Sequence, residues 1–194
     1  MRSRHTGSRR CPSLPVWLGL VASLRALGAA PVVLELGWQV PNGALALGLD
    51  PLSALFATAV FGLGLPAAVF GAGYLDSHGG RALGPFALFF NVLLASMATV
   101  VAARQALLFL VAWEVMTISS FLLVSLEHED PSVRSAARIY LVASHLGAAF
   151  VFALFLLLGS AAGSLRFEAF AALRARCADP WPRRATEANR CGNS

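Results

Sequence analysis

The sequence predicts an all-α integral membrane protein, a bundle of about five transmembrane helices with a short extracytoplasmic hairpin between the first and the second. Hydrophobic residues make up 57% of the 194 residues and charged residues only 13%, whereas about 25% is usual in soluble domains. The apolar residues form runs near the 20 residues that a spanning helix needs. The five expected spans are residues 14–34, 51–75, 86–103, 106–126 and 139–158.

The beginning of the chain has two interpretations. Residues 1–13 form a basic tail, and the apolar stretch 14–34 that follows contains Arg25. This stretch is either the first span or, together with the basic start, a signal peptide of residues 1–30, because LGAAP offers small residues for cleavage. Arg25 interrupts the apolar core and favours a span. Cleavage would leave four spans with the same orientation.

Residues 35–50 are expected to form the hairpin that leads into the second span. The Pro-Asn-Gly sequence at 41–43 is typical of a turn between two short extended segments. Asp50 suits the N-cap of the next helix, and Pro51 suits its first turn. Pro66 lies inside that span and predicts a kink.

The later segments complete the transmembrane domain, which we place at residues 14–170. Arg104 and Gln105 form a very short link between the third and fourth spans. The most charged loop is 127–138, and the glycines at 159 and 163 are expected to end the fifth span. Residues 171–194 are a polar, Arg-rich tail whose composition differs from the rest. Either the protein continues into more spans, or this tail is non-native to the fold.

The basic residues predict the orientation. All 15 are arginine, and no lysine occurs in the chain. Because arginine concentrates in cytoplasmic loops, the sequence predicts a multi-pass protein of the cell inner (cytoplasmic) membrane with a cytoplasmic N-terminus. Five spans would put the Arg-rich tail outside, against this rule. The seven arginines assigned to the inner side are Arg2, Arg4, Arg9, Arg10, Arg81, Arg134 and Arg138.

Several function classes are not expected. No basic stripe alternates with aromatic residues, so nucleic acid is not an expected partner. The three cysteines, Cys11, Cys177 and Cys191, have no CxxC spacing and no nearby histidine, so neither a metal site nor a cofactor is expected. No nucleophile–base set occurs either. Whether the chain belongs to an enzyme stays open, since redox centres would belong to partner subunits.

Glu114 is the strongest candidate for a functional residue. It lies near the middle of the apolar run 105–126, where a charge costs roughly 2.5–3.5 kcal/mol on insertion scales. Thr117 and Ser120 follow at three-residue steps, which suggests a hydroxyl-lined strip on one side of the helix. Hydroxyls hold water, and a carboxyl can load and unload a proton. The alternative is a structural carboxyl that is hydrogen-bonded to a neighbouring helix.

His145 lies about two turns into the fifth expected span, and histidine changes its charge near neutral pH. Counted from the inner ends of the expected spans, Glu114 and His145 differ in depth by about 8 Å. Direct contact is therefore not expected, but one or two waters could bridge the two side chains. The alternative is an ordinary interhelical hydrogen bond.

Three segments together resemble a known family. They are LGLDPLSALF, LLFLVAWEVMTISSFLLVSLEHED and ARIYLVASHLGAAFVFALFLLLGSAAGSLRFEAF. They are similar to the antiporter-like membrane subunits of complex I, Mrp antiporters and membrane-bound hydrogenases, and most similar to the hydrogenase-4 component B and formate hydrogenlyase branch. The resemblance covers about residues 35–170, and the Trp113–Glu114 pair is its most specific part.

The resemblance implies a proton-translocating membrane subunit, or a fragment of one, in a hydrogenase-4- or complex-I-like redox complex. In that family the Glu of the Trp-Glu motif pairs with a buried lysine on a later helix, and Glu114 matches that Glu. The implied partners are membrane lipid, other membrane and peripheral redox subunits, and protons, with sodium as the alternative ion. The electron donor and acceptor stay open.

The chain also departs from the family pattern. The family has more spans than five, and this chain has no lysine to serve as the partner of Glu114. We therefore expect a truncated member. The alternative function is a structural or assembly subunit without its own proton path. A solitary channel is a third possibility, but it would need inverted repeats, and the sequence shows none.

Overall fold

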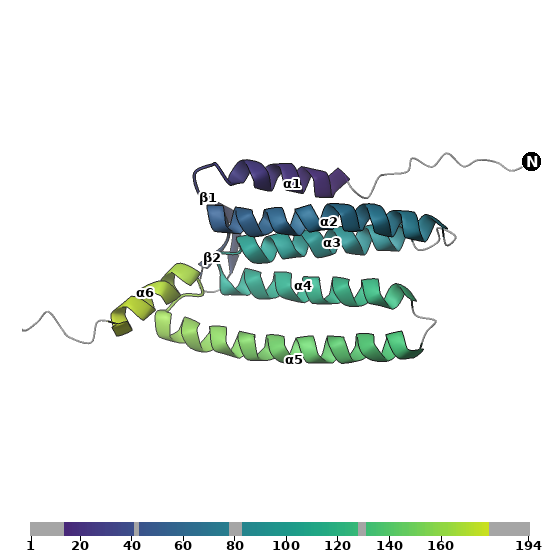
Figure 1. The fold of residues 1–194 in the computed structure, drawn as a ribbon. Helices are drawn as coiled ribbons and strands as arrows, with labels where there is room; N and C mark the ends of the chain where they lie inside the picture. The colour runs from purple at the N-terminus through teal and green to yellow at the C-terminus, as the bar shows by residue number, and fades with distance from the viewer. Residues whose placement is uncertain (1–13, 41–42, 78–82, 128–130, 179–194) are drawn as a thin grey trace, which may run out of the picture.

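Helices dominate the fold. The computed structural model describes residues 14–40, 43–77, 83–127 and 131–178. Figure 1 shows α1 to α5 side by side in chain order, with a hairpin and α6 at one end. The helices are α1 (Leu14–Ala26), α2 (Pro51–Ser77), α3 (Leu83–Ala102), α4 (Ala106–Val124), α5 (Pro131–Ala162) and α6 (Phe167–Ala178), the strands are β1 (Val32–Val40) and β2 (Gly43–Leu49), and η1 (Ser125–Glu127) is a short 3-10 helix.

Four of the described helices, α2 to α5, are long and apolar enough to cross a membrane. By contrast, α1 has 13 residues, about 20 Å of helix against a hydrocarbon core of about 30 Å. The predicted first span, 14–34, is therefore not one helix. Gly28 and Pro31 follow its end, and the chain is extended from Val32, as expected from two residues that disfavour continuing a helix.

The fifth span also differs from its prediction. We expected residues 139–158, whereas α5 has 32 residues. It begins at Pro131 because proline fits the first turn, where no backbone N–H is needed. It ends just before Gly163, whose φ of +71° lies in the left-handed region that glycine adopts without strain. This longer helix decides where His145 lies.

The two strands pair antiparallel in the segment where the sequence predicts a hairpin. Val32 lies opposite Leu49 and Glu35 opposite Ala46, with an irregularity in the register beyond Glu35. The expected turn residues Pro41 and Asn42 lie outside the described residues, as do the tails 1–13 and 179–194.

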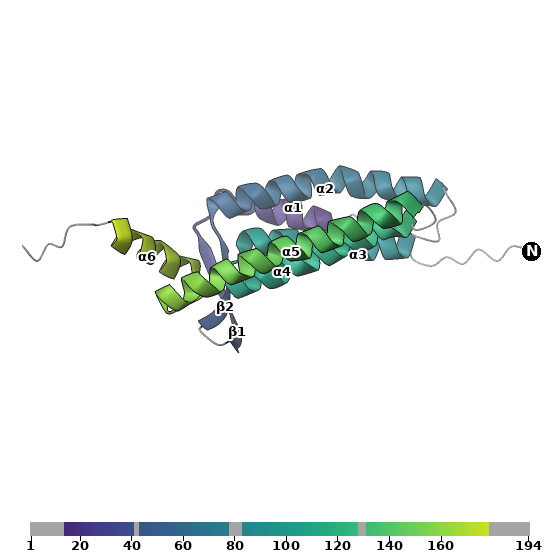
Figure 2. The same cartoon turned by 90° about the horizontal axis from the view of Figure 1, so that it is seen from below.

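Short backbone pairings connect the hairpin, the α3–α4 link and the start of α6. Arg104 N–H donates to the Ala46 carbonyl (3.0 Å), and Ala106 N–H donates to the Leu165 carbonyl (2.9 Å). Phe167 N–H donates to the Arg104 carbonyl (3.2 Å). Figure 2 shows these elements gathered at the same end of the bundle from a second direction. The link therefore satisfies its backbone groups with partners that lie far away in the sequence.

A cluster of buried apolar side chains lies between α1, α2 and α3. Val16, Ala68 and Leu94 are buried there, and partly buried side chains such as Phe61 and Phe90 surround them. In α5, by contrast, most apolar side chains are exposed, among them Ile139, Val142, Leu146, Phe150 and Leu157. This exposed apolar face suits contact with lipid or with other membrane helices.

Candidate functional site

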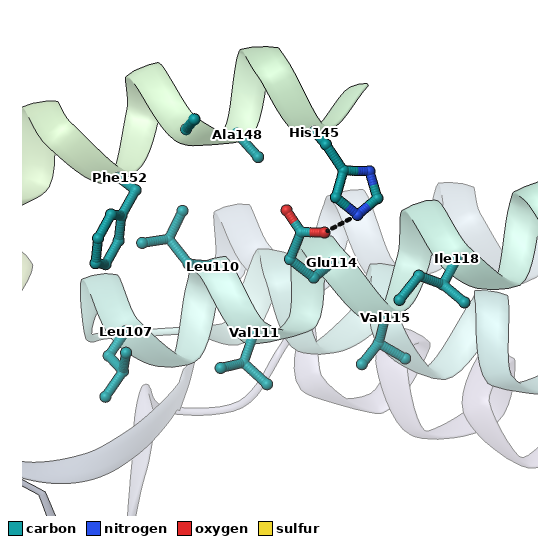
Figure 3. A pocket seen from close by; sticks show the side chains of 10 residues that line it. Leu107, Leu110, Val111, Glu114, Val115, Ile118, His145, Ala148 and Phe152 are labelled. Carbon is teal, nitrogen blue, oxygen red and sulfur yellow. Dashed lines mark ion pairs between the residues drawn. The ribbon is translucent and has the colours of Figure 1, made fainter. Parts of the chain in front are cut away.

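Glu114 lies eight residues after the start of α4, close to the middle of this 19-residue helix. It is the one charged residue in α4. Its side chain is partly covered, with 35% of its surface exposed. Figure 3 shows it directed toward α5 rather than toward the rest of the bundle.

His145 contacts Glu114 directly. Its Nε2 atom lies 3.2 Å from Oε2 of Glu114, so the expectation of a water-bridged pair is wrong. The reason is the length of α5, which begins eight residues earlier than the predicted span. Eight residues correspond to about 12 Å along a helix, enough to bring His145 to the depth of Glu114.

The other ring nitrogen of His145 also has a partner. Nδ1 lies 2.9 Å from the carbonyl oxygen of Leu141, one helical turn earlier. A carbonyl oxygen can only accept a hydrogen bond, so Nδ1 carries a proton in this geometry. The ring is thus held at both nitrogens, between its own helix and the carboxyl of Glu114.

The pair lies on the wall of a cavity between α4 and α5, with a volume of about 490 Å³. Apart from Glu114 and His145, its lining is apolar and includes no other titratable side chain. Glu114 and His145 are therefore the residues of this lining whose side chains can hydrogen-bond water. The lining residues are Leu107, Leu110, Val111, Glu114, Val115, Ile118, His145, Ala148, Ala149 and Phe152.

Thr117 and Ser120 are not among the residues that line this cavity. Thr117 is buried, and its hydroxyl donates to the Trp113 carbonyl of its own helix (3.0 Å). Each three-residue step turns the side chain about 60° back around the helix axis, since a full turn takes 3.6 residues. Ser120 is therefore about 120° away from Glu114, and the predicted hydroxyl strip does not face the pair.

Trp113, the neighbour of Glu114 in the motif, joins an aromatic cluster instead of the cavity. Its ring lies 5.6 Å from the ring of Phe109, and Phe109 meets Phe155 of α5 and Phe167 of α6 edge to face. Such pairs add about 0.5–1.5 kcal/mol beyond the area that they bury. The cluster joins α4, α5 and α6 near the Glu114 cavity. It therefore helps to hold α4 and α5, the two helices that carry Glu114 and His145, in register.

Asp50 forms the second polar cluster, at the hairpin end of the bundle. Its Oδ1 accepts the backbone N–H of Ser53 (2.7 Å), which makes Asp50 the N-cap of α2. Its Oδ2 accepts from Nη2 of Arg104 (2.8 Å). The Ser53 backbone N–H lowers the pKa of Asp50 below its ordinary value, and the Ser53 side chain and Arg104 lower it further. Pro51 occupies the first position of α2, as predicted.

No sequence pattern indicated the roles of Arg104 and Gln105. Arg104 is the partner of Asp50 across 54 positions, and no local pattern links the two residues. Gln105 is completely buried, and neither atom of its amide has a hydrogen-bond partner within the described residues. In the described part of the chain, no three His, Cys, Asp or Glu side chains gather where a metal ion could bind.

Comparisons with known proteins indicate the family of this chain. Residues 103–183 match the family model "NADH:quinone oxidoreductase/Mrp antiporter, TM". An uncharacterized protein of Mycobacterium tuberculosis is 34% identical over 142 residues, 73% of this chain and 22% of that protein. Hydrogenase-4 component B of Escherichia coli is 30% identical over 129 residues, 66% of this chain and 19% of that protein.

NADH-quinone oxidoreductase subunit L of Mycobacterium tuberculosis is 29% identical over 160 residues, 73% of this chain and 25% of that protein. This chain thus spans about a fifth to a quarter of the length of these curated relatives.

Two solved structures share the fold. One is the membrane-bound sulfane sulfur reductase, an archaeal respiratory membrane complex, with a TM-score of 0.65, 26% identity and coverage of 87% of this chain and 26% of the matched chain. The other is the Mrp complex from a Dietzia species, with a TM-score of 0.67, 18% identity and coverage of 84% and 33%.

The expected helical membrane fold class and the family resemblance are confirmed. The chain is a mostly helical, multi-pass membrane protein of a kind found in the bacterial and archaeal cytoplasmic membrane. Residues 103–183, which include Glu114 and His145, belong to the NADH:quinone oxidoreductase/Mrp antiporter transmembrane family, and the chain carries an antiporter-like membrane domain.

Proposed function

We propose that this chain is a proton-translocating membrane subunit, or a segment of one, in a hydrogenase-4- or complex-I-like redox complex. In this proposal Glu114 carries the proton within the membrane. The observation that supports it most is the direct contact between Glu114 and His145 (3.2 Å) on the wall of a cavity in the middle of two membrane-spanning helices.

The position of Glu114 argues for transport. At about 1.5 Å per residue, it lies about 12 Å from the first residue of α4 and about 15 Å from the last. An ionisable side chain at such depth is expensive and usually marks an ion or proton pathway. Because the carboxyl borders this cavity, a proton can reach Glu114 in this proposal without opening the bundle.

The names of the relatives indicate the kind of partners. They are described as a component, a subunit or part of a complex, so we propose that this chain works with other membrane subunits and with peripheral redox subunits. The exposed apolar face of α5 offers an area where such helices or lipid could pack. The N-terminus is proposed to be cytoplasmic, and the ion to be a proton, with sodium as the alternative.

The test compares the proton uptake of inverted membrane vesicles from cells with and without the chain, energised by the respiratory substrates of the host. The difference is the chain-dependent uptake. We expect Glu114→Gln to abolish it while the amount of assembled complex on a native gel stays unchanged. Glu168→Gln removes a carboxylate that is 55% exposed on α6 and is the matched control, which we expect to retain uptake. Full chain-dependent uptake in Glu114→Gln would contradict the proposal.

The alternative is a structural or assembly subunit without a proton path. The observation that favours it is that the Glu114–His145 contact joins α4 to α5 and could serve packing alone. In that case Glu114→Gln and Glu114→Ala would lower the yield of the complex on the native gel, and uptake would fall only in proportion to that yield. The ratio of uptake to assembled complex therefore separates the two functions.

A further inference from the structure

The contact between Glu114 and His145 specifies where one proton is held. We infer that the two side chains carry a single proton in common, between Oε2 of Glu114 and Nε2 of His145, and that the Leu141 carbonyl fixes the ring in the tautomer that this requires. The inference deepens the proposed function and rests on it for the role of the proton in transport. It concerns which atoms hold that proton.

The first step is the tautomer. Nδ1 of His145 is 2.9 Å from the Leu141 carbonyl oxygen, which has lone pairs but no proton to give. The same oxygen is the normal helical acceptor for the backbone N–H of residue 145, and its two lone pairs can accept both donors. Nδ1 is therefore the protonated nitrogen, and in neutral histidine Nε2 is then a bare acceptor.

The second step is the contact with the carboxyl. A bare Nε2 and an ionised carboxylate are both acceptors and cannot form a hydrogen bond with each other. At 3.2 Å the contact therefore requires one proton. That proton either sits on Glu114 and is donated to Nε2, or sits on Nε2 and is donated to the carboxylate. Passing from the first form to the second breaks one O–H bond and makes one N–H bond. The step is a proton transfer without oxidation or reduction.

The third step is the surroundings. With one shared proton, the pair has no net charge in either form, which suits its place among apolar side chains in a membrane-spanning region. The long helices α3 and α5 pack along α4, while α6 and η1 contact only its two ends. Of these, α3 holds no charged residue, and α5 holds only Arg134 and Arg138 besides His145. The charged residues of η1 and α6 include Glu127 and Glu168; η1 follows the end of α4, and α6 begins beside its first residue, so neither lies at the depth of Glu114. Arg138 is seven residues from His145, about 10 Å along the helix. Within the described residues, these helices place no cation at the depth of Glu114 that could balance an ionised carboxylate in place of the shared proton.

The arrangement makes His145 more than a packing partner. Because Nδ1 is fixed to Leu141, a rotation of the ring that exchanged the two nitrogens would break that bond. Since Oε2 and Nε2 are already in contact, the proton can move between them without any movement of the helices.

The test is ¹⁵N NMR of the full chain, labelled at histidine and placed in lipid nanodiscs. The chain has four histidines, so His145→Gln identifies the His145 signals by their loss. At about pH 6–8, we expect Nδ1 in the wild type to have the shift of a protonated nitrogen, and Nε2 to have a shift between those of the bare and protonated forms. Glu114→Gln removes the shared proton and should move Nε2 to the bare value while Nδ1 stays unchanged.

Two outcomes would overturn the inference. One is a protonated Nε2 with a bare Nδ1 in the wild type, which needs no variant and so does not depend on how any variant folds. The other is an Nε2 shift that is the same in the wild type and in Glu114→Gln, with helix content by circular dichroism equal in both.

This result is independent of the transport assay. If the expected shifts are found but Glu114→Gln retains full uptake, the shared-proton inference is supported and the proposed function is contradicted. If the opposite tautomer is found and Glu114→Gln loses uptake, only the shared-proton inference is contradicted.

Discussion

The Glu114–His145 pair and the Asp50–Arg104 pair are both close contacts, at 3.2 and 2.8 Å, but they lie in different parts of the molecule. The first joins the middles of two apolar helices and borders a cavity. The second joins the start of α2 to the link after α3, beside the hairpin. Each consists of one acid and one base, and in each the two residues lie far apart in the sequence.

The difference lies in the basic partner. Arginine keeps its proton at any ordinary pH, and Asp50 is held ionised by the Ser53 backbone N–H, then by the Ser53 side chain and Arg104. This pair therefore keeps both of its charges near neutral pH, as suits a structural role. Histidine can take or give a proton, so the pair at Glu114 can change its state. Comparable geometry thus supports two roles, and the chemistry of the base separates them.

The largest expected effect separates the two pairs by transport. Glu114→Gln should reduce chain-dependent proton uptake to the background, whereas Asp50→Asn should keep more than about half of it, because asparagine caps a helix about as well as aspartate. The measurement is uptake per assembled complex in inverted vesicles. A loss in Asp50→Asn as large as that in Glu114→Gln would show that the two pairs are not functionally distinct.

The next effect is on stability. Asp50→Ala removes both the cap of α2 and the partner of Arg104, so we expect the free energy of unfolding in detergent to fall by about 2 kcal/mol. Asp50→Asn keeps the cap and should cost about half as much. Equal losses in the two variants would show that the cap contributes nothing and that the ion pair carries the whole effect.

A similar but smaller loss is expected at Gly48. A Cβ atom at this position would collide with the side chain of Arg104, so Gly48→Ala should push Arg104 away from Asp50 and cost about 1.5 kcal/mol of unfolding free energy. The control is Gly73→Ala, where a Cβ atom meets no neighbouring atom within 4 Å. If the effect acts through the ion pair, the losses in Gly48→Ala and Asp50→Asn combine to less than their sum.

The smallest expected effect is the pH dependence of the Asp50 cluster. Since the pKa of Asp50 is lower in the folded state than its ordinary value of 3.8, its stabilising contribution is present above that value and is lost as the pH falls through the lower, folded value. The difference in unfolding free energy between the wild type and Asp50→Asn should therefore shrink below about pH 4. A difference that stays constant from neutral pH down to pH 3 would contradict this cause.

Local patterns predicted much of this fold. Apolar runs located α2, α3 and α4 to within a few residues, and the Asp50–Pro51 step correctly marked the start of α2. The start of α5 was missed because Arg134 and Arg138 interrupt the hydrophobic run, although Pro131 suits a helix start. That error alone accounts for the predicted difference in depth between Glu114 and His145, about one and a half helical turns.

Other features could not be predicted because they depend on tertiary structure. Asp50 and Arg104 are 54 positions apart in the sequence. Their contact depends on how the helices pack, and no local sequence spacing predicts it. The placement of Ser120 is a different case. Helix geometry alone shows that two three-residue steps turn a side chain about 120° away, so the sequence already contained the information that Ser120 would not face the pair.

The central claim is that Glu114 and His145 act as one proton-carrying unit, and a double-mutant cycle tests it most directly. Chain-dependent proton uptake per assembled complex is measured for the wild type, Glu114→Gln, His145→Gln and the variant with both changes. If the two side chains share one proton, the double variant loses no more than the more damaging single variant. Losses that multiply independently, or full uptake in His145→Gln, would contradict the account.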